Sequence, residues 1–154
     1  MRYLVLFLVL ASTIIRSASA QSVHFELGGP GLASINVDSR FGPGNGGIGG
    51  RVGIGGFSIN GSGVLFIPLG INYLLGKDNR NFFELGGGVT PVMGTGELST
   101  DEFSSTFGHL LIGYRKSPPN GGFVFRAFIS PVFGKGFFWP YYGGVSFGYK
   151  FGKR

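Results

Sequence analysis

The chain has 154 residues, 31 of them glycine and none cysteine; 16% are aromatic, only 13% are charged, and the formal net charge is +6. Soluble domains carry charge on about a quarter of their residues and disordered chains are poor in aromatics, so this composition fits neither class. The lack of cysteine excludes a lipoprotein anchor and a disulfide scaffold, and no apolar run of about 18 residues follows the N-terminus to form a membrane helix. A closed barrel remains as a structure that is both membrane-embedded and poor in charge.

The first twenty residues have the pattern of an export signal. Arg2 supplies positive charge, residues 4–15 form an apolar run too short to anchor the chain, and Ala18-Ser19-Ala20 is a small-residue cleavage site. We therefore predict a signal peptide over 1–20 and a single domain over 21–154. Without Arg2 and Arg16, eleven basic residues face seven acidic ones, a net charge of +4. These scattered charges favour anionic lipid head groups over nucleic acid as a partner.

Residues 22–40 alternate between apolar and polar side chains on both sides of Gly29-Pro30-Gly31. Phe25 falls on the apolar face and Glu26 on the polar face, and the same phase continues to Asp38. A hairpin with a three-residue loop and one long strand kinked at the proline both preserve this phase, so periodicity leaves both open. The turn character of Gly-Pro-Gly favours the hairpin, which also makes the number of strands even.

Six further alternating segments follow, and the clearest is residues 65–75, with six apolar side chains on one face. The turns between the segments are predicted at 42–47, 58–63, 77–80, 95–105, 117–122 and 134–136. Pro68, Pro91 and Pro131 fall inside segments, where we predict bulges or positions near strand ends.

These segments predict an all-β protein, an antiparallel up-and-down transmembrane β-barrel of eight strands. With both ends of the domain in the periplasm, the turns at Gly29–Gly31, 58–63, 95–105 and 134–140 are predicted outside the cell. The longest polar connection, 95–105, then lies on the outer side, as outer-membrane barrels require.

The last segment ends in Gly-Val-Ser-Phe-Gly-Tyr-Lys-Phe, with Phe151 as its final aromatic residue. This ending, the export signal and eight glycine-rich amphipathic segments resemble the small outer-membrane β-barrel proteins of Gram-negative bacteria, over residues 22–152. The resemblance implies an integral outer-membrane location and recognition of Phe151 by the barrel assembly machinery. Many members of the family stop at the aromatic residue, whereas this chain continues with residues 152–154.

Charged side chains recur on the predicted inward faces. They are Glu26, Asp38, Arg40, Arg51, Glu84, Arg115, Arg126 and Lys150. Glu26 and Glu84 stand in a repeated motif, Phe-Glu-Leu-Gly-Gly, and two facing carboxylates could perform acid–base chemistry. The interior of an eight-stranded barrel is filled by side chains and buried charges must be paired, so we predict a structural ion-pair network instead.

Other chemical features favour structural explanations. His24 and His109 lie in no recognisable motif and are predicted inside the barrel, although lipid A-modifying barrel enzymes use a histidine with a serine and an acid. Two histidines without cysteine make no metal site, and the glycine runs of 46–56 lack the lysine and helix of a phosphate loop. We predict no catalytic residue, cofactor or metal.

Aromatic residues near the ends of the segments are predicted to lie at the two membrane interfaces. They are Tyr73, Tyr114, Trp139, Tyr141, Tyr149 and Phe151. A ligand platform formed by residues 137–142 is the alternative for the aromatic cluster there.

The leading hypothesis for function is a non-enzymatic outer-membrane barrel with a packed polar interior, whose outer loops contact lipopolysaccharide or an external partner. A lipid A-modifying barrel enzyme and a narrow pore are the alternatives. A soluble secreted β-barrel is a structural rival, but the phenylalanine-rich face runs all the way round the predicted barrel.

Overall fold

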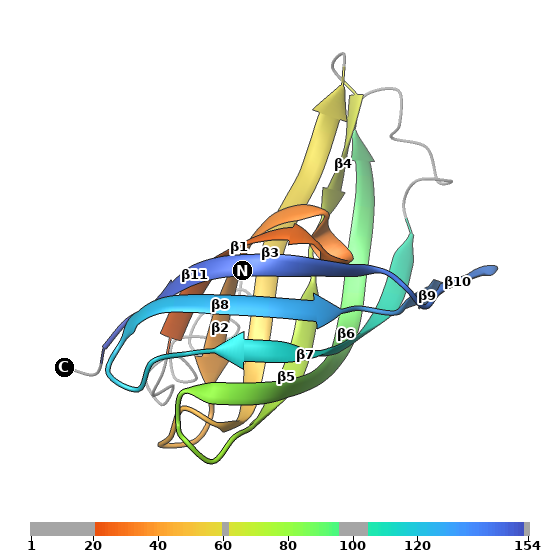
Figure 1. Cartoon of the computed structure of the whole chain (residues 1–154). Helices are drawn as coiled ribbons and strands as arrows, with labels where there is room; N and C mark the ends of the chain where they lie inside the picture. Colours follow the sequence, from red (N-terminus) through yellow and green to blue (C-terminus); the bar gives the residue numbers. More distant parts are fainter. Residues whose placement is uncertain (1–20, 60–61, 96–104, 153–154) are drawn as a thin grey trace, which may run out of the picture.

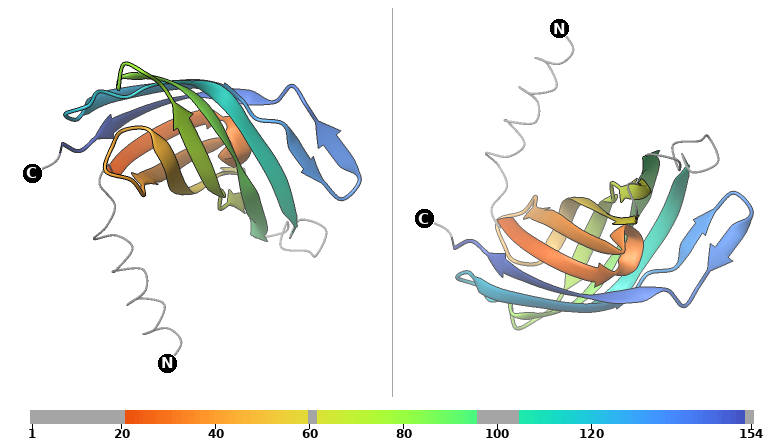
Figure 2. Two further views of the ribbon diagram at one scale, coloured as in Figure 1. Left: turned by 90° about the horizontal axis from the view of Figure 1, so that it is seen from below. Right: turned by 90° about the horizontal axis from the view of Figure 1, so that it is seen from above.

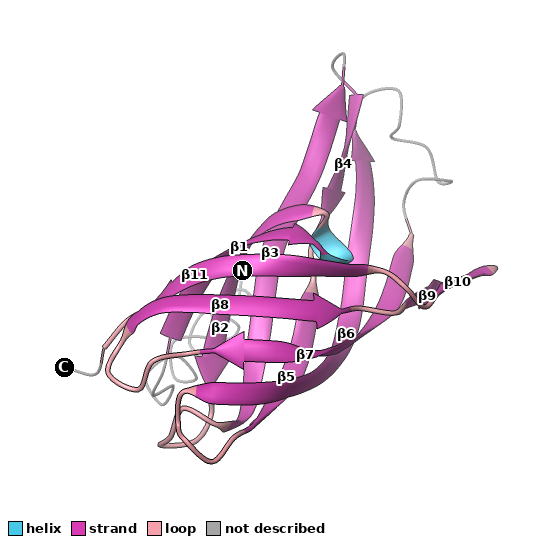
Figure 3. Ribbon diagram, viewed as in Figure 1, coloured by secondary structure: helices cyan, strands magenta, loops and turns pink. Residues whose placement is uncertain are grey.

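The computed structural model describes residues 21–59, 62–95 and 105–152. The predicted signal peptide and most of the predicted 95–105 loop lie outside these residues. The elements are β1 (Gln21–Gly28), the 3-10 turn η1 (Gly29–Gly31), β2 (Ala33–Arg40), β3 (Gly47–Ile59), β4 (Ser62–Phe66), β5 (Leu69–Leu75), β6 (Asn81–Thr95), β7 (Thr106–Lys116), β8 (Gly122–Ile129), β9 (Val132–Gly134), β10 (Phe137–Trp139) and β11 (Gly143–Lys150). Strands make up most of the described chain (Figure 3).

The strands form one antiparallel sheet that closes on itself (Figure 1). β1 pairs with β2 on one side and with β11 on the other, and the remaining pairings run in sequence from β2 round to β8 and β11. β4 and β5 are interrupted parts of one crossing of the barrel wall, and β8 and β11 are joined beyond their ends by the β9–β10 hairpin. The described residues therefore form the predicted eight-stranded up-and-down antiparallel barrel.

Residues 22–40 form a hairpin, which confirms the favoured alternative. The β1–β2 register pairs Phe25 with Ile35, and the Gly28 N–H donates to the Leu32 carbonyl over 2.6 Å to close the turn. The three residues of η1 are buried. Gly28 and Gly29 both adopt a positive φ, which lets the chain reverse direction within a few residues.

The prolines interrupt strands without leaving the barrel wall. Pro68 separates β4 from β5 and Pro131 separates β8 from β9, so both lie at strand ends, one of the two predicted placements. Their carbonyls still accept hydrogen bonds from Gly53 and Leu110, each over 2.9 Å. Pro91 lies within β6, opposite Thr106, where the pairing between β6 and β7 ends.

The two faces of the barrel wall differ in chemistry. Outward side chains are apolar and exposed on every crossing of the wall, for example Phe25, Ile35, Ile71 and Phe147. Inward positions hold buried polar and charged residues, with Val124 and Leu111 among the few buried apolar side chains. This inversion of an ordinary soluble fold is what a wall between lipid and a filled lumen requires.

The barrel has two unlike ends (Figure 1). Ser22 pairs with Lys150, so β1 starts where β11 finishes, and we call this the terminal end. The opposite end, which we call the mouth, carries η1 and the β9–β10 hairpin, and this hairpin extends away from the wall (Figure 2). β3 and β6 have 13 and 15 residues against eight in β1 and β2, so one side of the wall rises past the mouth. No helix within the described residues is long and apolar enough to cross a bilayer.

Candidate functional site

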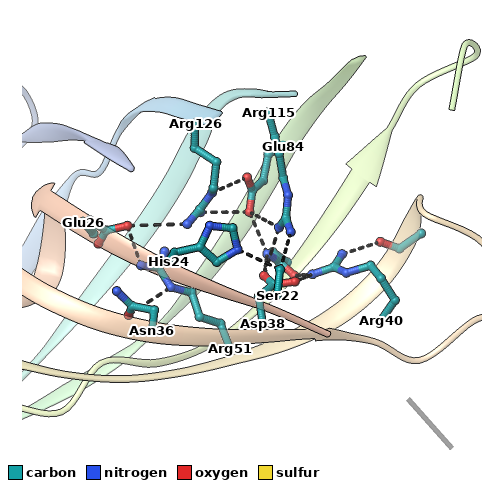
Figure 4. Close-up of polar contacts among 12 residues, drawn as sticks. Ser22, His24, Glu26, Asn36, Asp38, Arg40, Arg51, Glu84, Arg115 and Arg126 are labelled. Carbon is teal, nitrogen blue, oxygen red and sulfur yellow. Dashed lines mark hydrogen bonds and ion pairs between the residues drawn. The ribbon is translucent and has the colours of Figure 1, made fainter. Parts of the chain in front are cut away.

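The charged residues predicted for the interior come together in the middle of the lumen (Figure 4). They are Glu26 on β1, Asp38 and Arg40 on β2, Arg51 on β3, Glu84 on β6, Arg115 on β7 and Arg126 on β8. Each occupies an inward position of its strand because side chains alternate between the two faces of a strand. The closed wall then aims all seven at one axis.

Arg126 connects the two glutamates of the repeated motif. Its guanidinium donates to Glu84 through Nε, over 2.9 Å, and through Nη2, over 3.0 Å, in a two-point contact. Its Nη1 lies 3.5 Å from Glu26 Oε2, which also accepts from Arg51 Nη2 over 2.5 Å. The carboxylates of Glu26 and Glu84 are therefore each bound by guanidinium groups, which is suited to charge neutralisation rather than to acid–base chemistry.

Asp38 organises the part of the network nearer the terminal end. Its carboxylate pairs with Arg40 at 2.7 Å and with Arg115 at 3.1 Å. The Asn72 amide donates to Asp38 Oδ2 over 2.8 Å and to Glu84 Oε1 over 2.6 Å, while its oxygen accepts from Arg40. Asn72 thus joins the Asp38 group to the Glu84 group.

Asn72 and Asn36 also belong to this network, but they are uncharged and were not among the residues predicted for it. Asn36 Oδ1 accepts from Arg51 Nε over 3.2 Å, and its amide donates to Ser34. The available signal was their position, since both occupy inward positions of alternating segments. An amide can donate to a carboxylate and accept from a guanidinium, so it links groups of opposite sign.

Lys150 lies apart from the central group, at the terminal end. Its ammonium donates to Asn45 and to the carbonyls of Pro118 and Pro119, over 3.1 and 3.0 Å. It therefore ties the end of β11 to two turns at that end.

Glycines on the inward face of β3 make room for the network. A Cβ on Gly49 would lie 2.1 Å from the Arg40 guanidinium carbon, and one on Gly53 would lie 2.0 Å from Asn36 Oδ1. Both are far below van der Waals contact. The glycine run of this segment is thus explained by close packing against long side chains.

The two histidines are buried beside hydroxyl groups. His24 Nε2 lies 2.8 Å from Ser22 Oγ, which also accepts from Arg115 over 3.1 Å, and His109 Nδ1 lies 3.2 Å from Thr90 Oγ1. Ser22 and His24 are 1% and 0% exposed, so the serine hydroxyl is out of reach of a substrate. In the described residues no group of three or more His, Cys, Asp and Glu side chains is arranged to hold a metal.

The predicted interface aromatics fall into two groups. Tyr73, Tyr114, Tyr149 and Phe151 are exposed and lie towards the terminal end of their strands. Tyr141 is exposed near the mouth.

Trp139 belongs to the β9–β10 hairpin and is 62% exposed. It pairs with Val132, which in turn pairs with the inward-facing His109, so its side chain shares their face. Sequence periodicity does not assign Trp139 to a face, because the chain is interrupted at residues 140–142, which breaks the phase between Trp139 and β11.

Comparisons with known proteins identify the fold. No protein-family profile and no curated protein sequence matches the chain. Among solved structures, the crystal structure of the N-terminal β-barrel domain of Pseudomonas aeruginosa OprF is similar, with a TM-score of 0.61 and 10% sequence identity over 88% of this chain and 98% of that one. At this identity the likeness shows a shared barrel fold.

Proposed function

We propose that the protein is an integral outer-membrane β-barrel with a packed, non-conducting lumen, which acts through its mouth rather than through catalysis. The observation that carries this proposal is the combination of exposed apolar side chains around the outside of the wall, which we call the apolar belt, with a buried, ion-paired interior. Outer-membrane lipid, including lipopolysaccharide, is the partner of the belt, and the barrel assembly machinery inserts the chain.

Resistance to detergent tests the barrel in its membrane. A closed barrel has no unpaired strand edge, so it resists unfolding by detergent until it is boiled. We expect the outer-membrane fraction to contain a form whose gel mobility shifts on heating. A protein found in the soluble fraction with no shift would contradict the proposed location.

Arginine substitutions on the outer face of the wall test more sharply than the gel shift whether this face contacts lipid or water. Ile71 is 61% exposed near the middle of β5, and Leu75 is 47% exposed at the end of the same strand and on the same face. Ile71→Arg should lower the free energy of unfolding from lipid vesicles by about 2–4 kcal/mol, and Leu75→Arg by about 0–1 kcal/mol. Near-equal, negligible effects would mean that this face meets water.

The packed lumen argues against the narrow pore. Glu26, Asp38 and Arg126 are 0% exposed and lie where a water column would have to run. We expect the purified protein to give no steady conductance in planar bilayers. Regular single-channel steps that disappear when the protein is omitted would favour the pore.

The lipid A-modifying enzyme makes a chemical prediction of its own. Mass spectra of lipid A from cells with and without overexpressed protein should be the same, because the Ser22–His24 pair is buried. A new lipid A species that disappears with Ser22→Ala would support the enzyme instead.

A further inference from the structure

The mouth contains an apolar cavity of about 330 Å³, whose lining includes none of the charged residues of the lumen. Aromatic rings form one side of it, and the β1–β2 turn forms another. Its principal lining residues are Pro30, Leu32, Phe66, Phe107, Phe137 and Trp139. A volume of this size lies at the lower end of the range found for small-molecule sites, which is about 300–1,000 Å³.

The aromatic side is a continuous row of rings in contact. Phe66 meets Phe107 edge to face with ring centroids 6.4 Å apart, and Phe107 meets Phe137 in the same way at the same separation. Phe137 then meets Trp139 at 5.9 Å. Offset and edge-to-face contacts of this kind hold the rings in a defined arrangement.

The β9–β10 hairpin is apolar on both faces. Phe133 and Phe138 are paired on the outer face, where they continue the lipid-facing belt. Phe137 and Trp139 are on the inner face, yet they remain 38% and 62% exposed. A two-stranded ribbon is marginally stable alone, and one with two apolar faces needs an apolar neighbour on each.

The turn opposite the rings is held in an unusual conformation. Leu32 has φ +57° and ψ −81°, which leucine rarely adopts, and hydrogen bonds between the turn's own backbone groups maintain it. This conformation places Leu32 at the cavity, next to the buried Pro30. Strained backbone of this kind occurs where a surrounding structure dictates the position of a side chain.

We propose that this cavity binds a single hydrocarbon chain of an amphiphile, with the chain lying between the Pro30–Leu32 turn and the row of aromatic rings. An alkyl chain satisfies an apolar lining, and it is the abundant apolar group in the lipid around such a barrel. The chain comes from a lipid of the adjacent leaflet or from a free amphiphile. This inference rests on the proposed placement of the barrel in the membrane.

Trp139 is the one tryptophan of the chain, so its fluorescence reports on the cavity directly. In the first arm, the full chain without its signal peptide is folded in a fluorinated surfactant, and bromine-labelled laurate is added, because bromine quenches tryptophan on contact. In the second arm, the same protein is placed in phosphatidylcholine nanodiscs that contain bromine-labelled phospholipid.

Saturable quenching in the first arm, reversed by unlabelled laurate, supports the site and identifies a free amphiphile. If quenching by laurate in the first arm does not saturate, quenching in nanodiscs that is reduced by a substitution on the inner face of the hairpin still supports the site. That result identifies the membrane lipid as the source of the chain. The proposal is overturned if quenching in the first arm rises linearly with laurate concentration and nanodisc quenching is the same in the inner-face and outer-face variants described below.

Two neighbouring positions on the hairpin provide matched variants. Phe137→Ser changes the inner face and should weaken laurate affinity, or the nanodisc quenching, by at least about tenfold. Phe138→Ser removes the same side chain from the outer face and should change either by less than about twofold. Equal losses in the two variants would overturn the proposal.

A heat-dependent gel shift of each variant keeps failure of folding separate from failure of the site. A variant that shifts on heating but no longer binds supports the site, and wild-type competition by unlabelled laurate needs no variant at all. If the protein shifts on heating and shows no saturable or variant-sensitive quenching, the cavity proposal fails and the membrane placement stands. If no shift occurs, the placement fails, while laurate binding in the first arm still decides the site.

Discussion

The lumen and the mouth of this barrel differ in which side chains they bury. In the lumen, guanidinium and carboxylate groups are almost completely buried and bound to one another, as between Arg126 and Glu84. At the mouth, aromatic rings that would normally be buried remain uncovered on the inner side of a hairpin. The contrast indicates that the lumen contributes to a rigid wall, whereas the mouth leaves aromatic surface exposed, as the proposed binding of a hydrocarbon chain requires.

Removing the ion pairs of Arg126 in the lumen should have the largest effect on stability. Arg126→Met leaves Glu26 and Glu84 buried without their shared partner, and we expect the free energy of unfolding to fall by about 3–5 kcal/mol. Denaturant unfolding in lipid vesicles measures this loss. Adding Glu84→Gln should recover part of it, and Arg80→Met, in an exposed turn, should change stability by less than about 0.5 kcal/mol. A loss in Arg80→Met equal to that in Arg126→Met would mean that the ion pairs are not responsible.

The boundary between lumen and mouth is sensitive to one methyl group. Gly29 has φ +70°, and a Cβ there would lie 2.8 Å from Glu26 Oε1 and 2.9 Å from the Phe128 ring. Gly29→Ala should therefore destabilise the barrel by about 1–3 kcal/mol in the same unfolding assay. Gly42→Ala is the matched control, since nothing lies within 4 Å of a Cβ there. Equal losses in the two variants would exclude a steric role for Gly29.

The mouth should tolerate substitution far better than the lumen. Phe137 contributes ring contacts to Phe107 and Trp139 but remains partly exposed. Phe137→Ser should lower the free energy of unfolding by about 1 kcal/mol. A loss comparable to that of Arg126→Met would mean that the aromatic row is a second core rather than a binding surface.

The smallest effect concerns a turn at the terminal end. The Asn81 side-chain amide donates to Asp78, as do the backbone N–H groups of Asn81 and Arg80, and these hydrogen bonds lower the pKa of Asp78 to about 2. A lowered folded-state pKa means that the contribution of Asp78 to stability is present above its unfolded value of 3.8 and is lost as pH falls towards 2. Thermal unfolding of the wild type and Asp78→Ala should thus differ slightly at pH 5 and converge near pH 2. A difference that stays constant over this range would exclude protonation of Asp78 as its cause.

Much of the fold could be predicted because alternation is a local property. Outward and inward faces of the strands, the turns and the break at Pro68 all follow from neighbouring residues along the chain. The inward positions of Glu26, Arg51 and Arg126 were predicted in the same way. The face that Trp139 occupies was not predicted, because the interruption after it breaks the alternation, and the cavity beside it was not predicted either.

Residue spacing along the chain specifies an amphipathic closed barrel, since alternation decides which side of a strand each side chain occupies. Which interior charges meet, and the cavity at the mouth, emerge from the way the strands are arranged in space. Arg126 and Glu26 are 100 residues apart in sequence, and Arg115 and Ser22 are 93 apart. Contacts over such separations depend on the relative shift of eight strands around the closed wall, a geometric quantity that no local pattern contains.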